Sequence, residues 1–142
     1  MTMDADSRRC LVWGWFLLAV SLPLGLTLEA LHAMKVQVYL GSELRRELWT
    51  LAHAHGAILG ILCLVFASVS AQCIPNQRAR ARASRYLRWG SLLMPAGFFA
   101  GGVLSFEGDP SLGIILVPMG GLALLTALIV TGIATASGRD EG

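Results

Sequence analysis

Apolar residues in this chain are gathered into four long blocks that polar segments separate. The blocks are Cys10–Leu28, Leu48–Ala71, Trp89–Phe106 and Leu112–Ala136. A helix rises 1.5 Å per residue, so about 20 apolar residues cross the hydrocarbon core of a bilayer. With their polar ends included, the blocks predict four membrane-spanning helices over residues 10–34, 44–72, 87–106 and 111–136.

The segments between the blocks are short, and the last of them is only Glu107–Ser111. Short links make consecutive helices run antiparallel. The sequence therefore predicts an all-α fold, an integral membrane up-down four-helix bundle, with residues 1–142 as a single domain.

The composition agrees with a membrane protein. Of the 142 residues 55% are hydrophobic and 14% are charged, compared with roughly 45–50% and 25% in soluble domains. The first apolar block is longer than the core of a secretory signal peptide, so we expect it to remain as a span. The sequence therefore predicts the lipid bilayer as a partner.

Most of the eleven basic residues are predicted to lie on one side of the membrane. Short loops rich in Lys and Arg stay cytoplasmic, which places both termini in the cytoplasm and the protein in the inner (plasma) membrane as a multi-pass protein. The residues that set this orientation are Arg8, Arg9, Arg78, Arg80, Arg82, Arg85, Arg88 and Arg139.

The stretch RARARASRYLR, residues 78–88, has two interpretations. Its arginines would suit a patch that binds anionic lipid or nucleic acid. They would equally serve as a topology determinant that lies against acidic headgroups. The second interpretation is preferred because so short a link has no fold of its own, and no nucleic acid is predicted as a partner.

Small residues predict where helices approach closely. Gly56 and Gly60 form one G-x-x-x-G pattern, and Gly97 and Gly101 form another. Such patterns let backbones pack tightly in lipid, and the spans that carry them are predicted to pack on each other. Assembly into a homo-oligomer or a larger membrane complex is a further use of such faces.

The three cysteines are predicted to pack as ordinary apolar side chains. Cys10 and Cys73 fall at the cytoplasmic ends of their helices and Cys63 falls in the middle of the membrane. This spread, without any C-x-x-C pattern, argues against a structural disulfide.

All three histidines of the chain fall near the outer ends of the first two spans, where acidic residues also gather. Ionisable groups at membrane depth cost roughly 2.5–3.5 kcal/mol each, so they tend to face a cavity or a partner and to mark function. The residues concerned are His32, His53, His55, Glu29, Glu47, Glu107 and Asp109.

Helical geometry sorts these residues. Glu29 and His32 are three positions apart and share a face if the first helix continues past Leu28, so they could hold a metal ion together. His53 and His55 are about 200° apart around their helix and cannot readily ligate one ion.

His53 is the better candidate ligand, because Gly60 lies seven positions further on and places His53 on the close-packing face. A buried histidine that donates to a carbonyl is the alternative. His55 is expected to reach a neighbouring helix, another subunit or the interface. Glu107, at the predicted end of the third span, is a candidate member of the same site, as a ligand or a proton acceptor.

The AHAHG stretch resembles the histidine-bearing helices of the catalytic subunits of haem-copper oxidases and nitric-oxide reductases over residues 48–66. In those subunits an H-x-H pair sends its imidazoles toward different haems. They have about a dozen spans and six ligand histidines, so a binuclear haem-copper centre is excluded here on ligand count. The resemblance is compatible with a b-type haem that is held by His53 together with His32 or His55, of the same or another chain. It is equally compatible with a zinc, copper or iron site formed by Glu29, His32 and His53.

Three functions remain open. The first is a membrane protein with a His/Glu pocket at its outer side that binds haem or a transition metal in a redox role. The second is a non-catalytic accessory subunit of a larger membrane complex. The third is a proton or small-solute pathway, which is ranked last because the inner half of the helices offers no ionisable relay. Motifs of soluble enzymes, such as a phosphate loop, G-x-S-x-G or H-E-x-x-H, are missing from the sequence.

Overall fold

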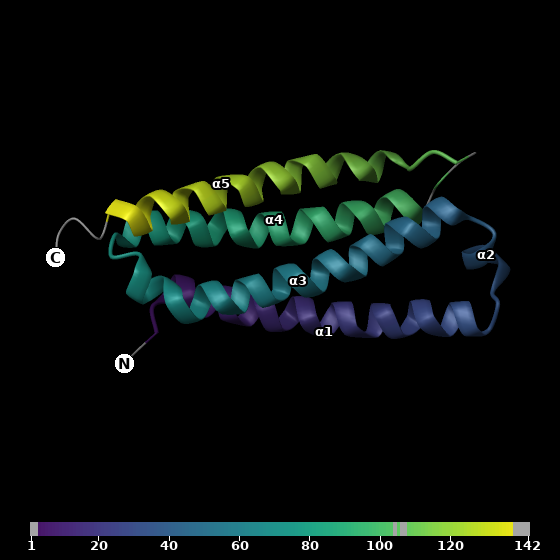
Figure 1. Cartoon of the computed structure of the whole chain (residues 1–142), viewed down its shortest axis with the longest axis horizontal. Coiled ribbons are helices and arrows are strands. Elements are labelled where there is room, and N and C mark those ends of the chain that lie inside the picture. Colours follow the sequence, from purple (N-terminus) through teal and green to yellow (C-terminus); the bar gives the residue numbers. More distant parts are fainter. Residues whose placement is uncertain (1–2, 104, 106–107, 138–142) are drawn as a thin grey trace.

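The structure is a computed structural model that describes residues 3–103, 105 and 108–137. Four long helices and two short ones account for most of these residues (Figure 1). In chain order they are α1 (Ala5–Ala33), α2 (Gln37–Leu40), α3 (Glu43–Cys73), α4 (Gln77–Val103), the 3₁₀ turn η1 (Leu112–Ile115) and α5 (Leu116–Ser137).

Three of the long helices begin at a polar residue that caps them. The side chain of Asp4 accepts hydrogen bonds from two backbone N–H groups of α1, and Ser42 accepts one at the start of α3. The Asn76 Oδ1 atom accepts from the N–H groups of Arg78 and Ala79. Such caps satisfy donors that a helix start leaves unpaired, and each contributes about 1 kcal/mol.

The long helices alternate in direction, as the short links predict. The start of α1, the link from α3 to α4 and the end of α5 share one end of the molecule, and α2 lies at the other (Figure 1). We name these the basic end and the histidine end, because the first carries Arg8, Arg9 and the arginines of α4, and the second carries all three histidines.

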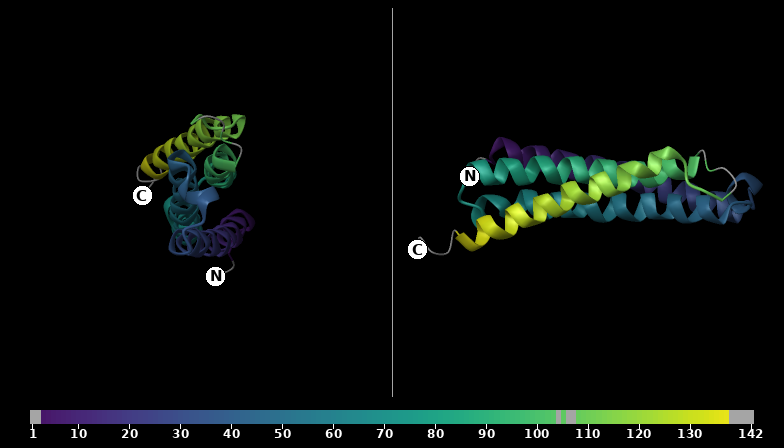
Figure 2. Two further views of the ribbon diagram at one scale, coloured as in Figure 1. Left: turned by 90° about the vertical axis from the view of Figure 1, so that its right-hand side faces the viewer. Right: turned by 90° about the horizontal axis from the view of Figure 1, so that it is seen from above.

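The helices pack as a chain of neighbours. α1 packs along α3, α3 along α4, and α4 along α5, with a smaller contact between α1 and α4. Over the described residues α5 has no extensive contact with α1 or α3, and the view along the helices shows α1 and α5 on opposite sides (Figure 2). The all-helical prediction is confirmed and the long helices run up and down as expected (Figure 1), whereas this packing does not confirm a four-helix bundle.

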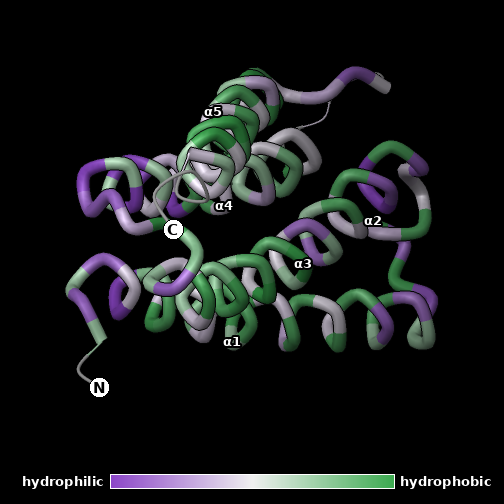
Figure 3. Tube along the Cα trace, turned by 60° about the vertical axis from the view of Figure 1, so that its left-hand side comes forward, coloured by the Kyte–Doolittle hydropathy of each residue, from purple (hydrophilic) through white to green (hydrophobic). Residues whose placement is uncertain are grey.

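Three helices of the described chain are long and apolar enough to cross a membrane: α1, α3 and the segment Leu112–Ser137. The tube coloured by hydropathy shows hydrophilic residues at the ends of the helices and apolar residues along most of their length (Figure 3). α4 differs because its first half carries five arginines. Of the four predicted spans, three therefore meet the length and apolarity of a membrane-crossing helix in the described residues.

The arginine-rich segment is helical, contrary to the prediction that it is a link without a fold. α4 starts at Gln77, about ten residues before the expected start of this helix. Alanine and arginine are both good helix formers, and Asn76 caps the helix at its start. Alternating Ala and Arg thus extend the apolar helix by several turns at the basic end.

α3 and α4, the helices that carry the two G-x-x-x-G patterns, pack on each other as predicted, but the shortest contacts of the glycines are with other helices. A Cβ atom on Gly60 would lie 3.1 Å from the carbonyl oxygen of Gly14, so the α3 pattern closes against α1. A Cβ on Gly97 would lie 2.8 Å from the backbone nitrogen of Val117, so the α4 pattern closes against α5. The patterns mark close helix contacts, and their closest approaches are to α1 for the α3 pattern and to η1 and α5 for the α4 pattern.

Candidate functional site

His53 lies in the interface between α1 and α3, at the histidine end. Its Nδ1 atom is 2.8 Å from the carbonyl oxygen of Ser21. A carbonyl oxygen only accepts, so Nδ1 carries the hydrogen, and Nε2 of the neutral ring is left with a lone pair. This is the hydrogen-bonded histidine that donates to a carbonyl, the alternative raised from the sequence, and it is also the tautomer that binds a metal through Nε2.

Gly25 makes room for the imidazole ring. A Cβ atom at this position would lie 2.5 Å from Cε1 of His53 and 2.8 Å from its Nδ1. Any larger residue would therefore push the ring away from the Ser21 carbonyl. The sequence reasoning did not identify Gly25, because it falls outside both G-x-x-x-G patterns.

A cavity of about 260 Å³ opens beside His53 between α1, α2 and α3. Glu29, Tyr39 and Thr50 supply its other polar side chains, and Gly25 and leucines of α1 complete the wall. Tyr39 is only 6% exposed, whereas Glu29 is open to the surface. The structure thus brings His53 and Glu29 to one cavity, from different helices.

His32 is exposed near the end of α1 and does not line this cavity. Glu29 is likewise exposed on the same helix. Glu47 and Asp109 are exposed as well, and Glu107 lies outside the described residues. Of the predicted residues that the structure describes, only His53 and Glu29 line a common cavity.

His55 faces the other neighbour of α3. Its Nδ1 atom is 2.8 Å from the carbonyl oxygen of Leu51, one turn earlier in the same helix. Its ring lies 4.9 Å from the ring of Phe98 of α4, measured between centroids. The prediction that the two histidines point in different directions, with His55 toward a neighbouring helix, is confirmed.

The described part of the chain contains no group of three or more His, Cys, Asp or Glu side chains that could hold a metal ion. A complete metal site would therefore need ligands beyond His53 and Glu29, from solvent, from another chain or from Glu107. The roles predicted for His32, His53, His55, Glu29 and Glu107 stay predictions.

Arg45 ties the elements of the histidine end together. Its guanidinium donates hydrogen bonds to the carbonyl oxygens of Val38 at 2.6 Å and Gly102 at 2.9 Å, and to Ser105 Oγ at 3.4 Å. Cationic side chains stabilise the carbonyls at a helix end, and Gly102 lies in the last turn of α4. The sequence pattern gave no signal for this role of Arg45.

An aromatic stack supports the same end. The Trp49 ring stacks between two others: its centroid lies 6.2 Å from that of Tyr39 and 5.4 Å from that of Phe99. The Trp49 indole N–H also donates to the carbonyl oxygen of Phe99 at 3.2 Å. The stack links α2, α3 and α4 and fixes the wall of the cavity that Tyr39 provides.

A second polar cluster, in the half of the molecule toward the basic end, was not foreseen from the sequence. Cys10 lies 3.3 Å from Ser84 Oγ, and Cys63 lies 3.7 Å from Ser91 Oγ. The Oγ atoms of Ser7 and Ser70 are 3.0 Å apart. All of these side chains are at most 1% exposed, and they join α1, α3 and α4; they are Ser7, Cys10, Cys63, Ser70, Ser84 and Ser91.

The cysteines therefore do more than fill apolar space. Cys10 and Cys63 belong to one buried cluster, although the sequence placed them at different depths. Each thiol contacts a serine of α4, so the pair fixes how α1 and α3 meet that helix. All three cysteines are free thiols, and Cys73 is exposed.

Asp4 and Arg80 close the cluster at the basic end with an ion pair of 3.4 Å. Burial opposes ionisation of the Asp4 carboxyl, but hydrogen bonds from Ser7 and the charge of Arg80 outweigh it and hold the pKa of Asp4 below its usual value. The carboxylate is thus stabilised by the fold, which ties α1 to α4.

Comparison of the chain with families of known proteins, with curated proteins and with solved structures finds no match.

Proposed function

We propose that this chain is a multi-pass membrane protein that ligates a transition metal through His53, in the cavity between α1, α2 and α3. The observation that supports this most is the fixed tautomer of His53, whose Nδ1 donates to the Ser21 carbonyl. Histidines that bind metals almost always donate their other nitrogen in this way, because the bond orients the ring and raises the basicity of Nε2.

The residues present suit a metal ion better than a haem within one chain. The cavity of about 260 Å³ is smaller than the roughly 300–1,000 Å³ of sites for drug-sized ligands. His55 faces α4 and does not line the cavity. A haem would therefore need a second chain to supply both room and an axial ligand.

His53 and Glu29 would hold the ion, and imidazole with carboxylate suits zinc, copper and iron. Bound copper or iron would supply one-electron redox chemistry at this end of the molecule. Gly25 admits the ring and Tyr39 shields the cavity, so the chain provides a partly closed site whose remaining ligands come from solvent or a partner.

The placement in the membrane is part of the proposal. α1, α3 and Leu112–Ser137 supply three spans. The apolar part of α4, Trp89–Val103, is about 22 Å long at 1.5 Å per residue and serves as the fourth, with Arg88 extending toward the headgroups. The basic end then lies in the cytoplasm and the His53 cavity on the opposite side of the inner membrane.

A cofactor-free accessory subunit is the second candidate. It is favoured by the observation that no third ligating side chain joins His53 and Glu29 among the described residues. In that role the Ser21 bond of His53 would only lock α1 onto α3, and His53 would affect assembly with partner proteins.

Metal analysis and an absorption spectrum of the full chain, purified from native-host membranes, test the proposal. We expect about one transition metal ion per chain in the wild type, loss of the metal in His53→Ala, and retention in His32→Ala, the matched control outside the cavity. A Soret band that disappears only in His53→Ala would identify the metal as haem iron shared between chains.

Metal-free, colourless wild-type protein would overturn the metal proposal. Equal metal content in wild type and His53→Ala would overturn it as well. If His53→Ala then lost partner proteins that co-purify in mild detergent, the accessory role would take its place.

A further inference from the structure

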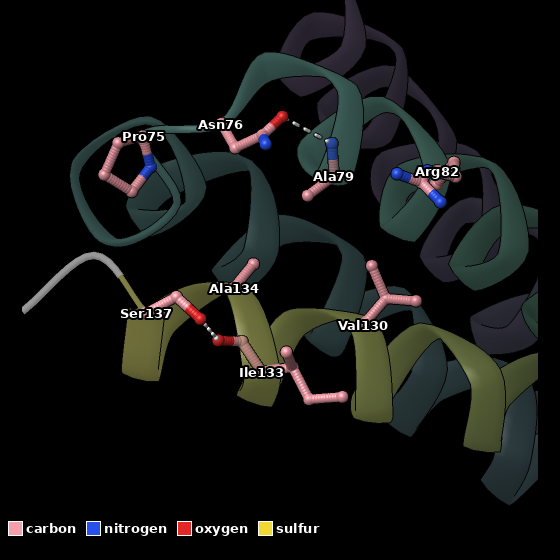
Figure 4. A pocket seen from close by; sticks show the side chains of 8 residues that line it. All are labelled: Pro75, Asn76, Ala79, Arg82, Val130, Ile133, Ala134 and Ser137. Carbon is pink, nitrogen blue, oxygen red and sulfur yellow. Dashed lines mark hydrogen bonds between the residues drawn. The ribbon is translucent and has the colours of Figure 1, made fainter.

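A groove at the basic end, on the opposite side of the molecule from His53's helix pair, combines a cation with an apolar wall. It has a volume of about 560 Å³ and lies between the start of α4 and the end of α5 (Figure 4). Arg82, Asn76 and Ser137 provide its polar part, and Val130, Ile133 and Ala134 of α5 provide its apolar part.

The polar part has donors to spare. The Asn76 Oδ1 atom is used in capping α4, which leaves the Nδ2 hydrogens for another acceptor. The Arg82 Nε atom donates to the carbonyl of Arg78 at 3.5 Å, so the two terminal nitrogens of the guanidinium remain available. No Asp or Glu of the described residues forms an ion pair with Arg82.

The apolar part of the groove lies where the hydrocarbon core of a bilayer would begin. Val130, Ile133 and Ala134 belong to Leu112–Ser137, the most apolar of the three candidate spans, and only 11% of the residues in its most apolar stretch are buried inside the molecule. A ligand that satisfies both halves of the groove must carry an anion and a hydrocarbon chain on one molecule. Phospholipids with a net negative charge have this construction, and basic pockets between membrane helices bind them.

We propose that this groove binds one anionic phospholipid, with its phosphate at Arg82 and Asn76 and an acyl chain along Val130, Ile133 and Ala134. The inference rests on the membrane placement in the proposed function, but not on the metal site. It goes beyond general attraction of the arginines to headgroups, because it assigns the effect to Arg82 and excludes Arg85 of the same helix, which does not line the groove.

Native mass spectrometry of the full chain in mixed micelles tests the assignment. The probes are phosphatidylglycerol and phosphatidylcholine with identical acyl chains. We expect the wild type to retain phosphatidylglycerol with about tenfold preference, which corresponds to about 1.4 kcal/mol. Arg82→Gln should abolish most of this preference, and the matched control Arg85→Gln, which removes the same charge from an exposed position, should keep it.

A second variant tests the apolar half without changing charge. Ala134→Phe fills the groove beside α5, so retention of both lipids should fall while Arg82 is intact. Circular dichroism and the elution profile of each variant show whether its fold is retained.

Equal loss of preference in Arg82→Gln and Arg85→Gln would overturn the proposal in favour of diffuse attraction to headgroups. Displacement of phosphatidylglycerol by millimolar inorganic phosphate would overturn it in favour of a site for free phosphate. A wild type without preference would also overturn it, and if that protein is still found in membranes with its metal, the proposed function stands.

Discussion

The close approach of α4 and α5 predicts how a single methyl group should affect stability. Gly120 of α5 packs directly on the α4 backbone, since a Cβ atom there would lie 2.7 Å from the Met94 nitrogen and 3.1 Å from its Cα. Ordinary contacts are 3.4–4 Å, so Gly120→Ala must push the helices apart by several tenths of an ångström. Overpacking of this kind costs about 1–3 kcal/mol.

Gly132 provides the matched control on the same helix. A Cβ atom at Gly132 has no described atom within 4 Å. Alanine is favoured over glycine in a helix by about 1 kcal/mol, and this gain applies to both variants. The difference between Gly120→Ala and Gly132→Ala therefore isolates the packing cost, and we expect Gly120→Ala to be less stable by about 1–3 kcal/mol.

The buried thiols supply the assay. Cys10 and Cys63 are 0% exposed, so a thiol-reactive fluorophore labels them only when the helices separate. In a Cys73→Ser background, which removes the exposed thiol, fluorescence on heating reports the melting temperature. For a chain of this size, 1 kcal/mol corresponds to roughly 3 °C, so the two glycine variants should differ by about 3–9 °C. Equal melting temperatures would show that α4 and α5 do not meet at Gly120.

Three further variants test the histidine end and the ion pair at the basic end. Gly25→Ala should displace the His53 ring and lower the metal content measured by elemental analysis, as is expected of His53→Ala. Unchanged metal content would refute the role of Gly25 in making room for the ring. Arg45→Gln should lower the free energy of unfolding by about 1.5–3 kcal/mol, the worth of a hydrogen bond to a charged group, and a melting temperature equal to that of wild type would contradict this. Because the pKa of Asp4 is lowered by the fold, its carboxylate stabilises the protein above pH 3.8, the value without the fold, and this contribution is lost as the pH falls below it. Asp4→Asn should therefore melt below wild type at pH 7 and approach it in acid, whereas a gap that is constant with pH would exclude the ion pair with Arg80.

The helices and their alternating directions could be predicted because block length and link length determine them. The bounds of α3 and α5 agree with the apolar pattern to within a few residues. The start of α4 could not be found from hydropathy, because its arginines break the apolar block while their helix propensity continues the helix. Helix propensity and hydropathy are separate properties, and only the second was used to place that boundary.

The packing of α3 on α4 was predicted, but the helix that each pattern approaches most closely was not, because a G-x-x-x-G pattern indicates a close approach without indicating the neighbour. The shortest contacts of Gly56 and Gly60 are with α1, and those of Gly97 and Gly101 are with α5 and η1, although Gly56 also lies near Pro95 of α4 and Gly101 near Leu48 of α3. The buried cluster of Cys10 and Cys63 depends on the same unknown. Residues 53 positions apart come together only when the axial register of α1 on α3 is fixed, and no local pattern contains that register.

The directions in which the two histidines of α3 point could be predicted, but the contacts that build the candidate site could not. The opposite orientations of His53 and His55 follow from their spacing, and the structure shows them. The Ser21 carbonyl that sets the His53 tautomer, and the glycine at position 25 that admits the ring, depend on contacts across the interface. Glu29 lines the same cavity as His53 because α1 packs on α3, whereas His32, three positions further along α1, does not line it.

A membrane-spanning array that separates the basic end from the histidine end is tested most directly by thiol labelling in intact cells. Cys73 is exposed at the basic end and provides the first labelling site. Met34 follows α1 at the histidine end and is 67% exposed. The variant Met34→Cys, made in a Cys73→Ser background, provides the second site. A membrane-impermeant maleimide should label the Met34→Cys variant in intact cells and native Cys73 only after the membrane is permeabilised. Labelling of both sites from the same side, or the reverse order, would contradict the arrangement.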